Sequence, residues 1–287
     1  MILLFVSSPM NNRSKFLLSL AKKVSDSYES NPNFAAAMVT GSAAKGLSDT
    51  YSDVDMSIFY KSPTTKKYFE EVKQSAINSG GGFYHGDHKN GFAVYHIIKG
   101  VKVDTGHTTI AEHEKMIKDF LKDPTLDFNH QIIASGTLFA IPLHGEKYIN
   151  KWKKWYSDYP KKLGDLMIKE HLRFHSKWVL EKMGLERNES IFVNETILKS
   201  LENCVKVLCG LNREYHPGKL KGVAYTINNL KHQPKNLKYC INNIFKIPQT
   251  TAVTEINKLA LGTIKLVEKY RPDIDTKKVN WLLNWKG

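Results

Sequence analysis

Residues 41–58 read GSAAKGLSDTYSDVDMSI, and this stretch decides the fold prediction. It follows a short apolar run at 34–40, which is typical of a buried strand. Small residues at 41–46 predict a turn, and residues 53–60 then alternate between apolar and polar side chains with a period of two. Such alternation is typical of a strand with one face in the core. The stretch therefore predicts two strands joined by a turn of small residues.

Helix and strand patterns surround this pair of strands. Apolar residues recur with helical spacing at about 14–28 and again at about 64–78. Three strand-like segments follow a glycine-rich loop, around 83–86, 91–98 and 101–105. Gly100 allows the last two to form a hairpin. Strands mixed with helices predict a mixed-sheet domain over residues 1–125.

The second half of the chain has a different pattern of apolar residues. From about residue 128 onward the periodicity is helical and there is little strand signal. Helices are predicted at 145–157, 161–184, 189–210, 220–230, 235–244, 251–270 and 276–285. The chain is therefore predicted to be an α+β protein in which an all-α C-terminal domain, residues 126–287, follows the mixed-sheet domain.

The composition favours a folded protein with anionic partners. Hydrophobic residues make up 41% of the 287 residues, and the formal net charge is +14. A basic balance favours nucleotides, RNA or a membrane surface as partners. Lysine supplies nearly all of this charge, since only five of the 42 basic residues are arginine. A lysine-rich and asparagine-rich chain can equally reflect the base composition of a genome, so both explanations stay open.

The sequence predicts a cytoplasmic protein without a membrane segment. No apolar run approaches the roughly 18 residues needed to cross a bilayer. The apolar residues 1–6 lack a basic flank and precede Ser7, Ser8 and Pro9, so they predict a short strand or buried arm instead of a signal peptide. The three cysteines lack zinc-ligand spacing and predict buried thiols in a reducing compartment.

Gly41 and Ser42 are candidate phosphate ligands. A Gly-Ser pair that follows a strand and opens a helix exposes backbone N–H groups that the helix itself does not satisfy. Glycine lets a phosphate approach the backbone closely, and the Ser42 hydroxyl adds a further donor. Gly-Ser turns are common, so this pair gains meaning only from the residues around it.

Asp53 and Asp55 are candidate magnesium ligands. Residues two apart on a strand point to the same face, so both carboxylates project together while Val54, Met56 and Ile58 face the core. Two carboxylates on one face repel each other unless a cation lies between them. Mg²⁺ prefers carboxylate and phosphate oxygens, so the pair fits a magnesium-bound nucleotide.

Asp104 is the candidate third carboxylate, in the segment Val-Lys-Val-Asp-Thr at 101–105. A neighbouring strand would bring Asp104 beside the other two aspartates. Three converging carboxylates can bind two metal ions, one that lowers the pKa of an acceptor hydroxyl and one that steadies leaving pyrophosphate. Taken alone, Asp104 would be an ordinary surface residue.

Together these residues resemble the motif of the DNA polymerase β-like nucleotidyltransferase superfamily: a strand, Gly-Ser, about ten further residues, Asp-hydrophobic-Asp on the next strand, and a later carboxylate. The Ser-Asp-Val-Asp form at 52–55 looks like that of stand-alone bacterial enzymes that adenylylate lincosamides or aminoglycosides. The resemblance covers residues 34–106, and helical second domains are also found in such enzymes. It implies two Mg²⁺ ions and transfer of a nucleoside monophosphate, AMP from ATP or another NTP, to a small-molecule hydroxyl.

A second segment belongs to the same resemblance. Residues 212–219 resemble an Asn-x-x-Tyr-x-Pro-x-Lys segment in the helical domains of such transferases. The resemblance implies that Lys219 or Tyr215 contacts the nucleotide. An ordinary polar loop between helices explains the segment as well.

Two alternative functions remain. The acceptor can be tRNA, another RNA or a protein, which the charge favours, since a polycationic aminoglycoside prefers an acidic site. A degenerate nucleotide-binding module is the non-enzymatic alternative, although all three carboxylates are present.

Overall fold

The computed structural model describes residues 10–287, and the segment at 1–6 for which a strand or buried arm is predicted lies outside them. The chain divides into two compact units. One takes in residues up to Lys122 together with Gly136–Asp158, and the other takes in Asp123–Ser135 together with Tyr159–Gly287. The first unit therefore recruits a second stretch of chain, at 136–158, beyond its main N-terminal part. Among the described residues, no helix combines the length and apolarity that a membrane crossing requires.

The first unit is built on a six-stranded mixed sheet with the order β3-β4-β5-β2-β1-β6. Its strands are β1 Phe34–Val39, β2 Val54–Tyr60, β3 Gly82–Asp87, β4 Gly91–Ile98, β5 Val101–Thr109 and β6 Ile141–His144. β2 and β5 are parallel, and the other neighbours are antiparallel. This confirms the prediction of an α+β chain with a mixed sheet in its N-terminal half.

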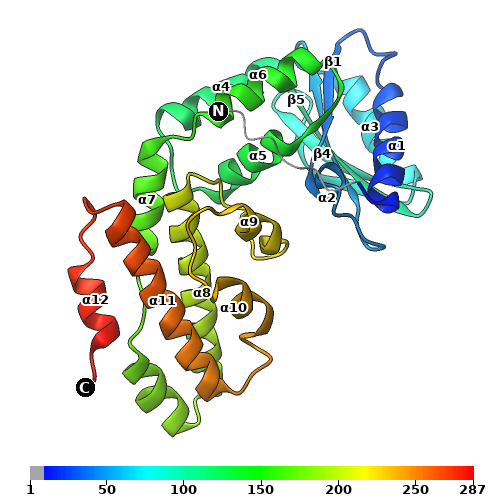
Figure 1. Ribbon diagram of the computed structural model, residues 1–287. Coiled ribbons are helices and arrows are strands. Elements are labelled where there is room, and N and C mark those ends of the chain that lie inside the picture. Colours follow the sequence, from blue (N-terminus) through cyan, green and yellow to red (C-terminus); the bar gives the residue numbers. More distant parts are fainter. Residues whose placement is uncertain (1–9) are drawn as a thin grey trace. The chain divides into compact units, whose positions relative to one another are not determined.

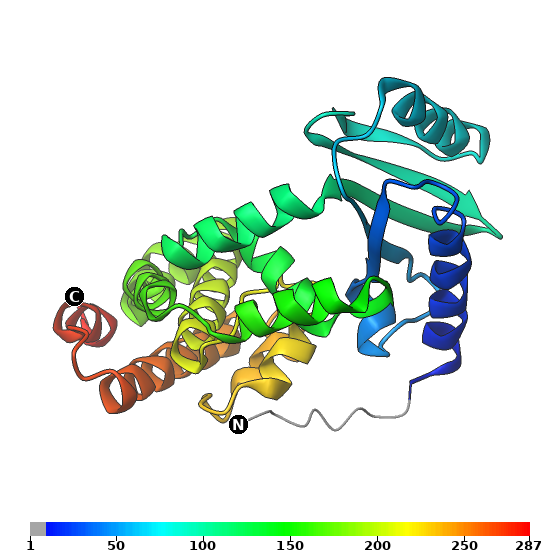
Figure 2. The same cartoon turned by 90° about the horizontal axis from the view of Figure 1, so that it is seen from above.

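Helices cover this sheet from both faces. They are α1 Asn12–Asp26, α2 Gly41–Lys45, α3 Lys66–Asn78, α4 Ile110–Lys122 and α6 Glu146–Ser157. Helix α1 packs on β1 and β2, while α3 packs on β3 and β4 (Figures 1 and 2). On the opposite face, Phe59 of β2 contacts His113 of α4 and Trp152 of α6, with ring centroids 4.9 and 4.6 Å away.

The core below α1 holds one face of β2 and β5 rigidly. Val54, Ile58 and Val103 have no exposed surface and pack with Leu17 and Ala21 of α1. Burying such an aliphatic side chain contributes about 1.5–3 kcal/mol. Because side chains alternate along a strand, the residues between these core positions emerge on the other face of the sheet.

The hairpin between β4 and β5 is present as predicted. Ile98 lies opposite Val101, and the two turn residues Lys99 and Gly100 have φ values of 52° and 73°. Positive φ at both positions is the type I′ geometry that matches the twist of paired strands. β5 runs four residues beyond the predicted end at 105. The prediction stops short because two of the buried positions there are the polar residues His107 and Thr109, so the apolar alternation is not visible in the sequence.

The second unit is helical, which confirms the predicted mostly helical C-terminal region. Its helices are α7 Lys161–His171, a π-helix Val179–Gly184, a 3₁₀ turn Leu185–Arg187, α8 Ser190–Asn212, α9 Val223–Asn229, α10 Leu237–Asn243, α11 Gln249–Tyr270 and α12 Lys277–Asn284. Figure 1 shows α8 alongside α11, and these two helices pack together. Cys204, Cys209 and Cys240 are buried free thiols here.

Between residues 110 and 184 the structure differs from the sequence-based predictions in three places. The helix predicted at 161–184 is interrupted after His171, because the Ser176 hydroxyl accepts from the Val179 N–H at 3.2 Å and starts a new helical segment. The helices α4 and α5 (Phe128–Phe139) were not predicted. Strand β6 was also missed because Pro142 signals a break, although an edge strand tolerates proline.

Candidate active site

Three carboxylates converge on one face of the central sheet. Asp55 on β2 lies directly opposite Asp104 on the parallel strand β5, and Asp53 immediately precedes β2. One carboxylate oxygen from each residue lies within 4.8 Å of the other two, and all three residues are half-buried. Adjacent strands are about 4.8 Å apart, so the register of β2 and β5 alone brings two of the three together.

Gly41 is fitted closely against Asp55. The Thr40 N–H donates to the Asp55 carbonyl oxygen at 2.8 Å, which holds the end of β1 beside β2. Gly41 then has a φ of +65°, and a β-carbon built on it would lie 2.2 Å from Asp55 Oδ2. Position 41 therefore requires glycine for two reasons, the left-handed backbone and the space that the carboxylate occupies.

Ser42 lies in the first turn of α2, which is only five residues long. A helix this short has only a small dipole, so the dipole adds little to phosphate binding. What the turn offers a phosphate is its exposed N–H groups and the Ser42 hydroxyl. The Ser42 hydroxyl lies 3.4 Å from that of Ser48. Gly46, in the left-handed conformation, ends the helix.

The beginning of α1 anchors the loop between α2 and β2. Asn11 Nδ2 donates to the Ser48 carbonyl at 2.8 Å, and the Ser48 N–H donates to Ser14 Oγ at 3.0 Å. Arg13 donates to the Ser52 carbonyl at 3.0 Å, one residue before Asp53. The N-terminal helix therefore fixes the loop that separates the candidate phosphate turn from the carboxylates. Sequence patterns give no signal for these contacts.

Asp104 is held by Tyr84 and Lys102, which are not among the residues predicted for the site. Tyr84 Oη donates to Oδ1 at 2.6 Å, and Lys102 Nζ donates to Oδ2 at 2.8 Å. Partial burial opposes the charged form of Lys102, but hydrogen bonds with Asp104 and Tyr84 outweigh it and raise the lysine pKa. Burial, and then the hydrogen bond to Asp104, raise the pKa of Tyr84. Lys102 was detectable, because residues two apart on a strand share a face.

Tyr215 and Lys219 belong to the second unit. The Tyr215 ring is buried there and packs against Tyr159 with a centroid separation of 4.9 Å. Lys219 is exposed in the turn that follows, where the Gly218 N–H donates to His216 Nδ1 at 3.0 Å. Tyr215 thus packs in a core, whereas the Lys219 ammonium is open to an anion.

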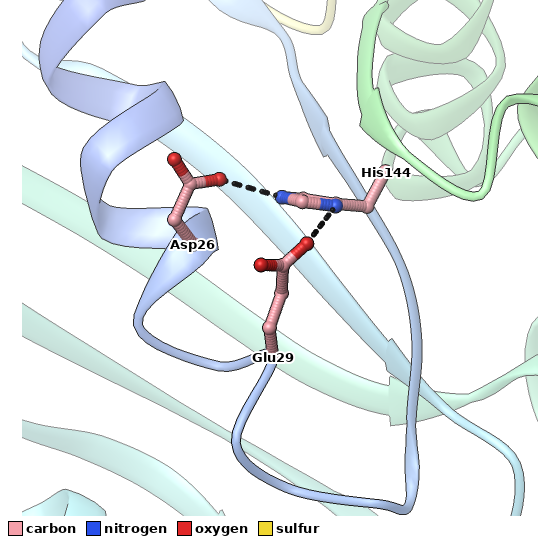
Figure 3. A group of neighbouring side chains, drawn as sticks. All are labelled: Asp26, Glu29 and His144. Carbon is pink, nitrogen blue, oxygen red and sulfur yellow. Dashed lines mark hydrogen bonds and ion pairs between the residues drawn. The ribbon is translucent and has the colours of Figure 1, made fainter.

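A second group of acidic and histidine side chains lies at the end of α1. His144 of β6 sits between Asp26 and Glu29, with its ring nitrogens 2.8 and 3.0 Å from their carboxylate oxygens (Figure 3). Lys22 also pairs with Asp26. Hydrogen bonds from Lys22 and then His144 lower the pKa of Asp26. These contacts join α1 to the edge strand, and Lys22 already supplies a cation there.

The donor set at Asp53, Asp55 and Asp104 fits a hard divalent cation. Carboxylate oxygens are the ligands that Mg²⁺ prefers, and three within 4.8 Å of one another concentrate negative charge. A tight cluster of this kind repels itself unless cations neutralise it. Lys102 neutralises part of this charge from the side of Asp104. The cluster is therefore able to hold a metal ion.

Comparisons with known proteins find distant structural likenesses. No family model and no curated protein matches the chain. A nucleotidyltransferase-like protein from Exiguobacterium sibiricum 255-15 is 10% identical with a TM-score of 0.38, over 88% of this chain and 75% of that chain. A CCA-adding enzyme in complex with CTP is 14% identical with a TM-score of 0.30, over 93% and 69%.

A third likeness is to the Thermotoga maritima CCA-adding enzyme complexed with tRNA. It is 12% identical with a TM-score of 0.31, over 93% of this chain and 68% of that chain. At such identities and scores these likenesses are remote, and they assign neither an activity nor a substrate to this chain.

Proposed function

We propose that this protein is a magnesium-dependent nucleotidyltransferase that moves a nucleoside monophosphate, AMP from ATP, to a hydroxyl of a small molecule. One observation carries the proposal. Asp53, Asp55 and Asp104 converge within 4.8 Å of one another, and Gly41 of the candidate phosphate turn packs directly on Asp55. The candidate metal ligands and the candidate phosphate turn are thus adjacent, which supports binding of a magnesium-bound triphosphate.

In this proposal each residue has a separate role. Gly41 and Ser42 bind the β- and γ-phosphates through backbone N–H groups and the Ser42 hydroxyl. Asp53 and Asp55 would hold two Mg²⁺ ions, and Asp104 would complete the ligand set. Bound Mg²⁺ supplies Lewis-acid stabilisation of phosphate charge and lowers the pKa of a nearby hydroxyl.

The reaction is an in-line displacement at the α-phosphorus. The acceptor oxygen forms a bond to that phosphorus, the bond to the β-phosphate oxygen breaks, and pyrophosphate leaves. The acceptor hydroxyl loses a proton in this step, and Asp104 is the proposed group to accept it. Positioning and charge stabilisation account for most of the rate enhancement in phosphoryl-transfer enzymes, which agrees with a site built from rigid strands.

Label transfer tests the proposal. Purified protein is incubated with Mg²⁺ and each NTP labelled at the α-phosphate, against lincomycin, kanamycin and bulk tRNA as acceptors. We expect label on a small molecule and release of pyrophosphate, both of which stop when EDTA is added. If the protein binds no nucleotide in the presence of Mg²⁺, the proposal is wrong.

Transfer to RNA is the second candidate, and the net charge of +14 favours it. Binding of bulk tRNA at increasing salt separates the two. Electrostatic binding through several phosphates falls by orders of magnitude as salt rises from low to physiological levels. Label on tRNA with this salt dependence supports the RNA acceptor, and absence of tRNA binding at low salt removes it.

A further inference from the structure

An aromatic pair continues the row of carboxylates across the sheet. Tyr95 of β4 lies opposite Asp104 of β5, which in turn lies opposite Asp55 of β2. Side chains of directly opposite residues share one face of the sheet, so the Tyr95 ring is on the same face as both carboxylates. Tyr84 of β3 joins this row, since its hydroxyl contacts Asp104 and its ring packs on Tyr95.

The two tyrosines together with Lys102 form a platform, and the platform below means Tyr84, Tyr95 and Lys102. The two ring centroids are 5.1 Å apart with an interplanar angle of 39°, and the Lys102 ammonium is 5.5 Å from each. Tyr84 is 47% exposed. A β-carbon on Gly82 would lie 3.1 Å from the Tyr95 ring. The Tyr95 ring therefore packs directly on the backbone of β3 at Gly82.

The platform and the candidate phosphate turn lie on opposite sides of the carboxylates. In the sheet order, β1 leads into Gly41 on one side of β2, while β5, β4 and β3 extend on the other side. An in-line displacement requires the attacking oxygen and the leaving group on opposite sides of the phosphorus. If the triphosphate tail binds at Gly41, the acceptor approaches over β5 and β4, where the platform lies.

The chemistry of the platform restricts the acceptor. Tyrosine rings stack on flat partners, either aromatic rings or the C–H face of a sugar, and their hydroxyls accept and donate hydrogen bonds. With Mg²⁺ balancing the carboxylates in the proposed complex, the Lys102 ammonium is the charge beside both rings, and it disfavours a polycation relative to neutral or anionic groups. We infer that Tyr84, Tyr95 and Lys102 form the acceptor subsite, for a small molecule that carries a sugar or aromatic ring and little positive charge.

This inference rests on the proposed function, so the experiment measures the two separately. Protein labelled with ¹³C in its tyrosine rings is first titrated with Mg²⁺ and a non-hydrolysable ATP analogue by calorimetry. The nucleotide-bound sample is then titrated with p-nitrophenyl β-D-glucopyranoside, kanamycin or bulk tRNA, and ring signals are followed by NMR. Tyr84→Leu and Tyr95→Leu assign the signals of the platform.

Tyr239→Leu is the matched control, because Tyr239 is 44% exposed but lies in the second unit. We expect the uncharged glycoside to shift the Tyr84 and Tyr95 signals. We also expect Tyr95→Leu to weaken glycoside binding about fivefold or more, because aromatic stacking is lost. Its affinity for the nucleotide analogue should be unchanged. Tyr239→Leu should bind the glycoside as the unmodified protein does.

Three results would overturn the inference. The first is that no probe shifts the ring signals of Tyr84 and Tyr95. The second is that glycoside affinity is the same with and without Tyr84→Leu or Tyr95→Leu. The third is that kanamycin or tRNA shifts these signals at lower concentrations than the glycoside does. Each of these leaves nucleotidyl transfer standing as long as the nucleotide analogue binds with Mg²⁺, and tighter binding of tRNA would favour the RNA acceptor. Failure of that first titration instead removes the proposed function itself.

Discussion

A β-carbon on Gly41 would lie 2.2 Å from Oδ2 of Asp55, so the carboxylate occupies the space that any side chain at position 41 would need. This contact couples the candidate phosphate turn to the candidate metal ligands. The turn after β1 and the carboxylate on β2 therefore have their positions set by each other, without an intervening side chain.

Gly41→Ala should abolish Mg²⁺-dependent nucleotide binding, an effect larger than its loss of unfolding free energy explains. The left-handed φ of +65° costs an L-residue about 1–2 kcal/mol, and the new methyl group must also displace Asp55. Gly100→Ala is the control, since Gly100 has a φ of +73° and open space around its β position. We expect similar losses of unfolding free energy from the backbone strain, but loss of Mg²⁺-dependent nucleotide binding only for Gly41→Ala. Equal nucleotide binding by both variants would contradict the coupling.

Asp53→Asn should remove label transfer while the protein stays folded. The substitution keeps the shape of the side chain and removes a negative charge from the cluster, so we expect a rate at least roughly 10²–10³-fold lower. Asp119→Asn is the control, because Asp119 is an exposed residue of α4 that pairs with Lys115. Circular dichroism checks the fold of both proteins. A near-normal rate for Asp53→Asn would remove this aspartate from the proposed metal site.

Lys102→Met should lower the Mg²⁺ concentration needed for half-saturation. The Lys102 ammonium contacts Asp104 at 2.8 Å and therefore competes with a metal ion for its charge. The Lys102 side chain is 40% exposed, so solvent screens the effect, and we expect about 1 kcal/mol, a roughly fivefold change. Calorimetric titration with Mg²⁺ in the presence of the ATP analogue measures it. An unchanged or higher requirement for Mg²⁺ would mean that Lys102 does not compete.

His107 should make the fold sensitive to acid. Burial, and then nearby His96, lower the pKa of His107 to about 3, while Tyr60 and Thr105 hold its ring at 2.9 and 3.0 Å. Below the ordinary pKa of 6.5 the unfolded chain takes up a proton that the folded chain does not. The contribution of neutral His107 to the free energy of unfolding is therefore complete above about pH 6.5, and it is lost as the pH falls toward about 3.

His107→Phe tests this assignment, because phenylalanine can stack on Phe92 as His107 does, with ring centroids 4.3 Å apart. Between pH 6 and 4 the slope of unfolding free energy against pH should become shallower by up to about 1.4 kcal/mol per pH unit. At pH 7 the variant should lose about 1–2 kcal/mol with the two hydrogen bonds. Denaturant unfolding over this pH range measures both effects. Parallel pH profiles for the two proteins would contradict the assignment.

Short-range patterns were sufficient for much of the first unit. The alternation at 53–60 predicts strand β2 to within one residue, and it predicts that Asp55 projects away from the core positions Val54 and Ile58. Gly100 predicts the β4–β5 hairpin. These features could be read from the sequence because a strand alternates with a period of two and because positive φ favours glycine.

The tertiary structure alone decided which residues meet. The adjacency of β5 and β2 puts Asp104 opposite Asp55, and the order of the strands brings Tyr84 to the same carboxylate. Strand β6 joins the sheet from more than a hundred residues away in the chain. By itself, the sequence determined the local elements and the residue types able to hold metal and phosphate. Register and strand order determined their convergence, because they depend on packing between segments that no local pattern encodes.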